Sequence, residues 1–223
     1  MRTQTKETQA QLTPAKAIEI LVEGNKRFVN NQKADRNLLQ QVKETSTGQY
    51  PFAIILSCID SRTSSELIFD LGMGDIFNAR IAGNIVNEDI LGSMEFACKV
   101  AGSKLIVVLG HTKCGAVKGA CDHVELGNLT GLVKKIEPSV NSVETEGEKN
   151  SSNSEFVEKV AEANVHRMLD EIQEKSSILK EMIEKGEIGI IGGMYDVETG
   201  EVDFYEQTFN KSGALNEELA GKR

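Results

Sequence analysis

The sequence has no tryptophan, only three prolines, and no apolar run near the length of about 18 residues that a transmembrane helix needs. We therefore expect no membrane association. Reactive side chains are also few, with four cysteines and three histidines among 223 residues. That is too few cysteines for a disulfide framework, and no secretory signal precedes them. The sequence predicts a cytoplasmic protein whose thiols stay reduced and available to a metal.

Charge of one sign is in excess. The chain has 25 Lys and Arg against 34 Asp and Glu, which gives a formal net charge of −9. Such a surface repels phosphate backbones, so we expect no nucleic-acid partner. The length allows a single sizeable core. We predict one domain over residues 13–223, with an N-terminal helical arm at about 13–50 and a disordered or extended tail at 1–12.

Short apolar runs alternate with helical patterns along the chain. The runs predict buried strands at about 52–56, 75–80, 104–109 and 188–194, and a Thr-Gly turn predicts a hairpin over 195–204. Helices are predicted at about 14–30, 88–101, from 115, and between 156 and 185, whereas 137–154 is predicted to be a solvated loop. This order is typical of an α/β fold, with a central, mainly parallel sheet of about four strands plus an antiparallel edge strand, flanked by helices.

Two clusters of chemically active side chains follow two of the predicted strands. Cys58, Asp60 and Arg62 come after the first run, and His111 and Cys114 come after the third. Ligands of open parallel sheets bind at the carboxyl ends of strands, so the clusters converge if these strands are neighbours. Two thiolates and one imidazole suit a zinc ion with one open position. Either cluster alone is explained equally well by ordinary burial of cysteine.

The two clusters resemble family signatures. Cys58-Ile-Asp60-Ser-Arg62 and His111-Thr-Lys-Cys114-Gly115 are similar to the C-x-D-S-R and H-x-x-C-G motifs of the β-class carbonic anhydrases. The likeness continues through residues 12–28, 80–84 and 195–200, so it covers about 12–208. It implies an enzyme, a carbonate dehydratase of the lyase class, that hydrates carbon dioxide reversibly to bicarbonate and a proton by zinc-bound hydroxide.

The resemblance also implies roles around the metal. One Zn²⁺ per chain would be held by Cys58, His111 and Cys114. Asp60 would accept a hydrogen bond from zinc-bound water, and Arg62 would keep Asp60 oriented. In a closed state Asp60 could instead become a fourth zinc ligand, so the pair could switch the site off.

Three further residues are assigned by resemblance to substrate. Gln49 stands nine residues before Cys58, like the substrate-binding glutamine of the plant-like subclass, here of the bacterial type. Phe77 matches an aromatic residue that lines the carbon dioxide pocket, and the backbone amide of Gly115 would face bicarbonate. The absent tryptophan belongs to the inhibitory bicarbonate site of another subclass, so that site is expected to be missing.

Other interpretations share parts of this pattern. Relatives of the fold hydrolyse carbonyl sulfide or carbon disulfide at similar zinc sites, and a non-catalytic zinc-binding or thiol-redox protein is the alternative from another class. The family's active sites lie at dimer interfaces, so a homodimer or a dimer of dimers is expected. The remaining cysteines and histidines are assigned to packing or to the surface: Cys98, Cys121, His123 and His166.

Overall fold

The fold is built on a five-stranded sheet in the order β2-β1-β3-β4-β5. The computed structural model describes residues 3–206 and 209, so residues 210–223 of the predicted domain lie outside the described part. The strands are β1 (Ala53–Ser57), β2 (Ile76–Arg80), β3 (Leu105–His111), β4 (Gly189–Tyr195) and β5 (Val202–Phe204). Neighbouring strands are parallel except β4 and β5, which are antiparallel. The predicted fold class, with four parallel strands and an antiparallel edge, is confirmed.

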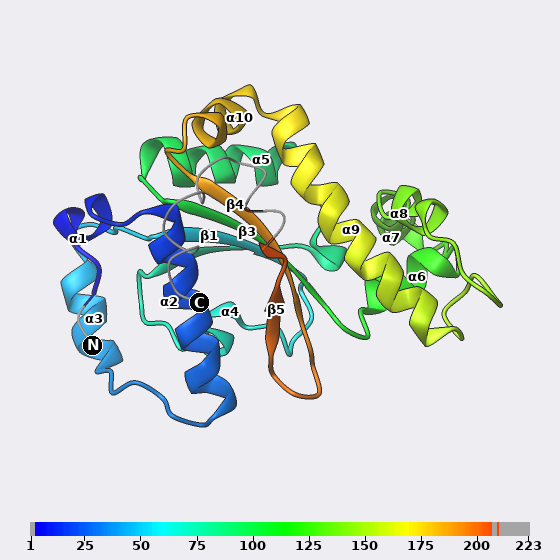
Figure 1. Cartoon of the computed structure of the whole chain (residues 1–223), viewed down its shortest axis with the longest axis horizontal. Coiled ribbons are helices and arrows are strands. Elements are labelled where there is room, and N and C mark those ends of the chain that lie inside the picture. Colours follow the sequence, from blue (N-terminus) through cyan, green and yellow to red (C-terminus); the bar gives the residue numbers. More distant parts are fainter. Residues whose placement is uncertain (1–2, 207–208, 210–223) are drawn as a thin grey trace.

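Helices cover both faces of this sheet (Figure 1). They are α1 (Lys6–Ala10), α2 (Pro14–Val29), α3 (Leu38–Thr45), α4 (Ser65–Ile68), α5 (Glu88–Glu95), α6 (Gly115–Cys121), α7 (Gly127–Val133), α8 (Glu137–Ser142), α9 (Ser154–Lys175) and α10 (Ser177–Glu184). A π-helical turn at Phe96–Val100 prolongs α5. No helix in the described part of the chain combines the length and apolarity needed to cross a membrane.

Alternate residues of the buried strands supply two separate cores. Ile54 and Leu56 of β1 belong to a cluster with residues of α5, α6, α8, α9 and α10. Ala53 and Ile55 belong to a second cluster with Ala17 and Leu21 of α2. A strand buried on both faces reads as a continuous apolar run, which is why the strand boundaries were predictable. Helix α2 begins as predicted, because the side chain of Thr13 caps it and Pro14 occupies its first turn.

The strand order creates a switch point between β1 and β3. The chain leaves β1 to form β2 on one side, then returns to form β3 on the other side of β1. Ser57, at the end of β1, is paired with Leu109 near the end of β3. The two predicted clusters therefore leave the sheet at adjacent carboxyl ends, as the α/β switch-point rule requires.

Two segments differ from the sequence-based expectation. The predicted tail contains helix α1, whose Gln9 is buried and donates from Nε2 to the carbonyl oxygens of Pro51 (2.8 Å) and Ala101 (2.9 Å). The predicted loop at 137–154 begins with α8, where Pro138 sits in the first turn, a position that needs no amide donor. Both helices are short and polar, so hydrophobic periodicity does not reveal them.

The N-terminal arm is fastened to the body of the molecule by a buried carboxylate. Asp70 accepts hydrogen bonds from Arg27 Nε (2.6 Å), Arg36 Nη1 (2.5 Å) and the amide of Ala34 (3.1 Å). Burial opposes ionisation of Asp70, but these donors together hold its pKa below the usual value. These contacts of Asp70 join three segments: α2, the segment that leads to α3, and the turn after α4.

Candidate metal centre

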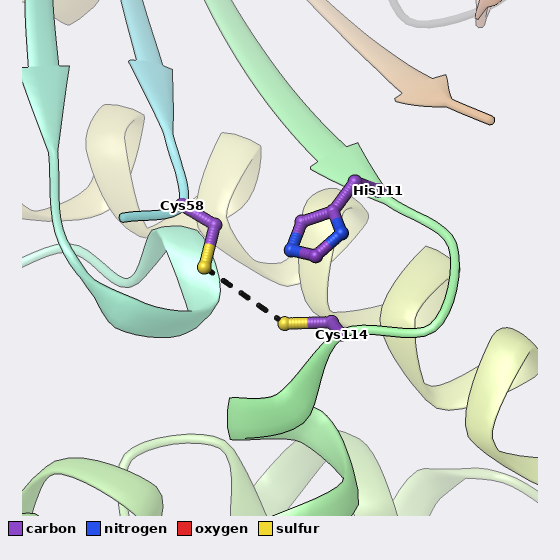
Figure 2. A group of neighbouring side chains, drawn as sticks. All are labelled: Cys58, His111 and Cys114. Atoms are coloured by element: carbon purple, nitrogen blue, oxygen red, sulfur yellow. Dashed lines mark hydrogen bonds between the residues drawn. The ribbon is translucent and has the colours of Figure 1, made fainter. Parts of the chain in front are cut away.

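Three buried side chains meet at the switch point (Figure 2). Cys58 follows β1, His111 is the last residue of β3, and Cys114 immediately precedes α6. One ligand atom from each lies within 4.8 Å of the other two. The sulfur atoms are 4.0 Å apart, close to the roughly 3.8 Å expected for two thiolates that bind one tetrahedral zinc at about 2.3 Å. The predicted convergence of the two clusters is confirmed.

The imidazole of His111 is oriented as a metal ligand. Its Nδ1 lies 2.9 Å from the carbonyl oxygen of Thr112, an arrangement in which Nδ1–H donates and Nε2 keeps its lone pair. Nε2 is buried and has no hydrogen-bond partner in the described part of the chain. A buried nitrogen without a partner is costly unless something else binds it. With two sulfurs beside it, this atom fits a metal ion.

The sulfur atoms of Cys58 and Cys114 lie within hydrogen-bonding distance of each other. The hydrogen bond between them lowers the pKa of Cys58 and raises that of Cys114, and burial adds to the rise at Cys114. The amide of Gly83 also donates to Cys58 Sγ, at 3.3 Å, and favours the thiolate. The centre is therefore built to hold negative charge on sulfur, as a cation site should be.

Asp60 borders this group and is held by Arg62. Arg62 donates from Nε to Oδ1 (2.9 Å) and from Nη2 to Oδ2 (2.7 Å), which holds the pKa of the Asp60 carboxyl well below its usual range. Oδ2 lies 4.0 Å from His111 Nε2. Both carboxylate oxygens bind Arg62, and Asp60 is not among the residues of the group that could hold a metal. The closed state, with Asp60 as a fourth ligand, stays a prediction.

Arg80 braces the loop that joins the first ligand to Asp60. It donates from Nε to the carbonyl oxygen of Cys58 (2.9 Å) and from Nη2 to that of Asp60 (2.5 Å). The role of Arg80 was not predicted from the sequence, because a guanidinium that binds backbone carbonyls leaves no motif of its own. Its place at the end of β2, in register with Ser57, was the available signal.

Glu158 braces the second ligand turn. Lys113 lies between His111 and Cys114 with a φ of +56°, in the left-handed region. The Oε1 atom of Glu158, on α9, accepts a hydrogen bond from the Lys113 amide at 2.8 Å. Holding a non-glycine residue in this region costs conformational energy, and the hydrogen bond from Lys113 to Glu158 helps to offset that cost. Glu158 was not predicted from the sequence, because it is one of several acidic residues on a charged helix.

Comparison with known proteins agrees with this geometry. The family profile described as "Carbonic anhydrase" matches residues 53–202, which include all three potential ligands. Carbonic anhydrase 2 of Mycobacterium tuberculosis is 35% identical over 193 residues, covering 84% of this chain and 90% of that protein. The chain belongs to the β-carbonic anhydrase family. A carbonic anhydrase of Mycolicibacterium smegmatis is 32% identical over 192 residues, covering 85% of this chain and 92% of the relative.

Solved β-carbonic anhydrases share the fold. The structure of CcaA aligns with a TM-score of 0.65 at 28% identity, covering 84% of this chain and 87% of that one. CafA of Aspergillus fumigatus aligns with a TM-score of 0.64 at 27% identity, covering 78% and 86%. The family resemblance expected from the motifs is confirmed.

Two of the three predicted substrate residues do not lie beside the metal group of their own chain, which consists of Cys58, His111 and Cys114. Gln49 is exposed and precedes the amino end of β1, so the whole strand, roughly 17 Å at about 3.3 Å per residue, separates it from Cys58. Phe77 pairs in register with Ile54, near the same amino end, and contacts Phe96 at a ring-centroid distance of 6.1 Å.

The third predicted substrate residue does lie beside the ligands. Gly115 follows Cys114 directly, as the first residue of α6, and is exposed. A Cβ built on it would meet no heavy atom within 4 Å, so open space surrounds this position. Its predicted contact with bicarbonate remains a prediction.

The other cysteines and histidines lie away from the metal group. Cys98 and Cys121 are buried among apolar side chains, and burial raises the pKa of both thiols. His123 is exposed near Glu137, with 3.7 Å between Nδ1 and a carboxylate oxygen. His166 stacks on Tyr205 with ring centroids 4.9 Å apart. Packing and surface positions are what the sequence predicted for these four residues.

Proposed function

We propose that this protein is a zinc-dependent carbonic anhydrase of the plant-like subclass that converts carbon dioxide and water reversibly to bicarbonate and a proton. The observation that carries the proposal is the buried Cys58, His111 and Cys114 group, with the unpartnered Nε2 of His111 turned to two sulfurs and an oriented carboxylate at its edge. Membership in the β-carbonic anhydrase family supports it.

The three ligands would hold one zinc ion per chain. Two thiolates and an imidazole suit a borderline-soft cation, and a three-residue set leaves one coordination position open. When bound, zinc supplies a Lewis acid that makes water a nucleophile near neutral pH. The two thiolates would offset the charge of the ion, so water would be acidified less than at an all-histidine site. The surrounding residues would therefore have to help more in removing the proton.

Asp60 and Arg62 would orient the reacting water. Paired with Arg62, the carboxylate of Asp60 stays ionised and accepts a hydrogen bond from water that approaches the open position. The proton released in each turnover must then pass to solvent. Gly115 lies beside Cys114 with open space around it, and its amide would donate to the bicarbonate product.

We further propose that a homodimer, or a dimer of dimers, completes the site. Gln49 and Phe77 lie toward the amino end of β1, away from their own chain's ligands, so they would serve the site of a neighbouring chain. Exposed apolar side chains support such contact: Ile59, Leu67 and Met73 are 61%, 62% and 48% exposed. The four free cysteines support a reducing, cytoplasmic location.

Metal analysis and stopped-flow carbon dioxide hydration with a pH indicator test these proposals. We expect about one zinc per chain in the wild type and its loss in Cys114→Ser. Asp60→Asn should retain zinc and lose about 100-fold in hydration rate, a typical contribution of a positioned acid or base. Wild-type protein that holds zinc but hydrates no carbon dioxide would refute the enzyme assignment. Turnover of carbon disulfide in that sample would point to the hydrolase alternative.

A further inference from the structure

A buried amide on α9 is connected to the metal centre through a single glycine. Asn164 is completely buried, and its Nδ2 donates to the carbonyl oxygen of Gly83 at 2.9 Å. Its Oδ1 lies 3.3 Å from the hydroxyl of Ser139, which donates to it. An amide in an apolar core is costly unless its polar atoms are paired. Both ends of this amide have partners, and one partner leads to the ligand Cys58.

Gly83 links the hydrogen bond of Asn164 to the position of the Cys58 sulfur. Its carbonyl oxygen binds Asn164, while its amide donates to Cys58 Sγ at 3.3 Å. Its φ is +69°, in the region that favours glycine. A Cβ at this position would lie 2.5 Å from Cδ1 of the buried Ile136. The turn is therefore crowded and conformationally demanding, so something must hold it in this orientation.

We propose that Asn164 is a positioning residue for the metal centre: it fixes the Gly83 turn so that the Gly83 amide stays directed at the sulfur of Cys58. The inference rests on the proposed function, because it takes that sulfur to be a zinc ligand. A hydrogen bond to an anionic sulfur stabilises its charge in a buried setting. Partners of this kind, one layer beyond the ligands, commonly set metal affinity.

The test compares two substitutions on the same helix. Asn164→Leu keeps a similar side-chain volume but removes the donor to Gly83. Ile172→Ala is the matched control, since it empties a completely buried position of the same core about 12 Å farther along α9, eight residues at about 1.5 Å each. Large-to-small substitution at such a position destabilises the fold without touching Gly83.

Release of zinc to an excess of a colorimetric chelator is measured on the folded, zinc-loaded proteins. We expect Asn164→Leu to release zinc about 10- to 100-fold faster than wild type, the usual effect of losing such a partner, and Ile172→Ala to match wild type. Equal release from Asn164→Leu and wild type would overturn the inference. Equal acceleration in both variants would overturn it too, because general loosening would then explain the effect.

Cobalt substitution gives a readout that loss of stability alone does not move. With the hydrogen bond to sulfur lost, the thiolate-to-cobalt charge-transfer band should move to longer wavelength in Asn164→Leu and stay in place in Ile172→Ala. An unmoved band contradicts the inference. If Asn164→Leu does not fold, Ser139→Ala decides: faster zinc release than Ile172→Ala supports the inference, and wild-type release refutes it. Wild-type protein that binds no zinc would instead refute the proposed function.

Discussion

The Gly83 turn makes the sharpest prediction about the integrity of the fold. Replacing Gly83 by alanine adds one methyl group where φ is +69° and where the new Cβ would lie 2.5 Å from Ile136 Cδ1. The usual separation of two such carbon atoms is about 3.5–4.0 Å. Ile136 is completely buried, so its side chain has little room to withdraw. The substitution therefore carries a conformational cost and a packing cost together.

The two costs can be estimated separately. A left-handed conformation costs an alanine about 1–2 kcal/mol, and overpacking a tight core costs about 1–3 kcal/mol. Alanine regains about 0.5–1 kcal/mol by restricting the unfolded chain. The net expectation for Gly83→Ala is a loss of about 1–4.5 kcal/mol in the free energy of unfolding, a large part of the roughly 5–15 kcal/mol typical of a domain.

Ile136→Val separates the packing cost from the conformational cost. Alone it should cost about 0.5–1.5 kcal/mol. In the Gly83→Ala background it removes the overlapping methyl group, so the double variant should be about 1–3 kcal/mol more stable than the sum of the single effects predicts. Gly92→Ala is the control glycine: a Cβ there meets nothing within 4 Å in α5, and the change should stabilise by about 0.5–1 kcal/mol.

Urea unfolding of the four zinc-loaded variants and the wild type, at one protein concentration, measures these free energies. Wild-type stability in Gly83→Ala would refute the steric reasoning. Strict additivity of Gly83→Ala and Ile136→Val would show that the methyl groups do not collide. A destabilising Gly92→Ala would show that glycine is needed for reasons other than space and backbone conformation.

Three further predictions concern the arm, the second ligand turn and the metal. Asp70→Asn should cost about 3 kcal/mol at neutral pH, because it leaves two arginines beside a neutral side chain. Because folding lowers the pKa of Asp70, its contribution to the free energy of unfolding is present above about pH 4, the unfolded value, and is lost as the pH falls below it. Urea unfolding should therefore show that the difference in stability between Asp70→Asn and the wild type becomes smaller in acid. Glu158→Ala should release zinc about tenfold faster than wild type, whereas Glu158→Gln, which keeps an acceptor for Lys113, should fall between them; equal rates would contradict the bracing role. Chelation should lower the thermal midpoint, and zinc at about 1,000 times its Kd should restore about 4 kcal/mol; Cys114→Ser should respond to neither, as differential scanning fluorimetry can check.

The sheet and the ligand group were predictable because their signals are local. The apolar run predicted a strand at 52–56, and β1 spans Ala53–Ser57. The rule that parallel strands bind ligands at their carboxyl ends brings Cys58 to His111 if the two strands are neighbours, and the structure shows β1 and β3 paired. The residue types and the strand topology both indicate the carboxyl ends of these two strands, so the metal group could be predicted from the sequence.

The residues that steady the ligands could not be predicted in this way. Arg80, Glu158 and Asn164 all act on backbone groups, and any side chain of suitable reach can do so. Which carbonyl or amide each one meets depends on how α9 and β2 pack, not on spacing along the chain. Helix α1 escaped prediction for a similar reason, because the distant carbonyls that bind Gln9 help to hold it.

The centre is therefore steadied by elements that contribute no ligand. Arg80 from β2 holds the loop of the first cysteine, and Glu158 from α9 holds the turn of the histidine and the second cysteine. Asn164, also from α9, holds Gly83, whose amide donates to the sulfur of the first cysteine. Helix α9 therefore contributes to holding both cysteines, Cys58 through Gly83 and Cys114 through the turn that contains Lys113. Asp60 is held in the same manner, because Arg62 binds both of its carboxylate oxygens and Arg80 of β2 binds its carbonyl oxygen, so β2 helps to preorganise the residue beside the group as well.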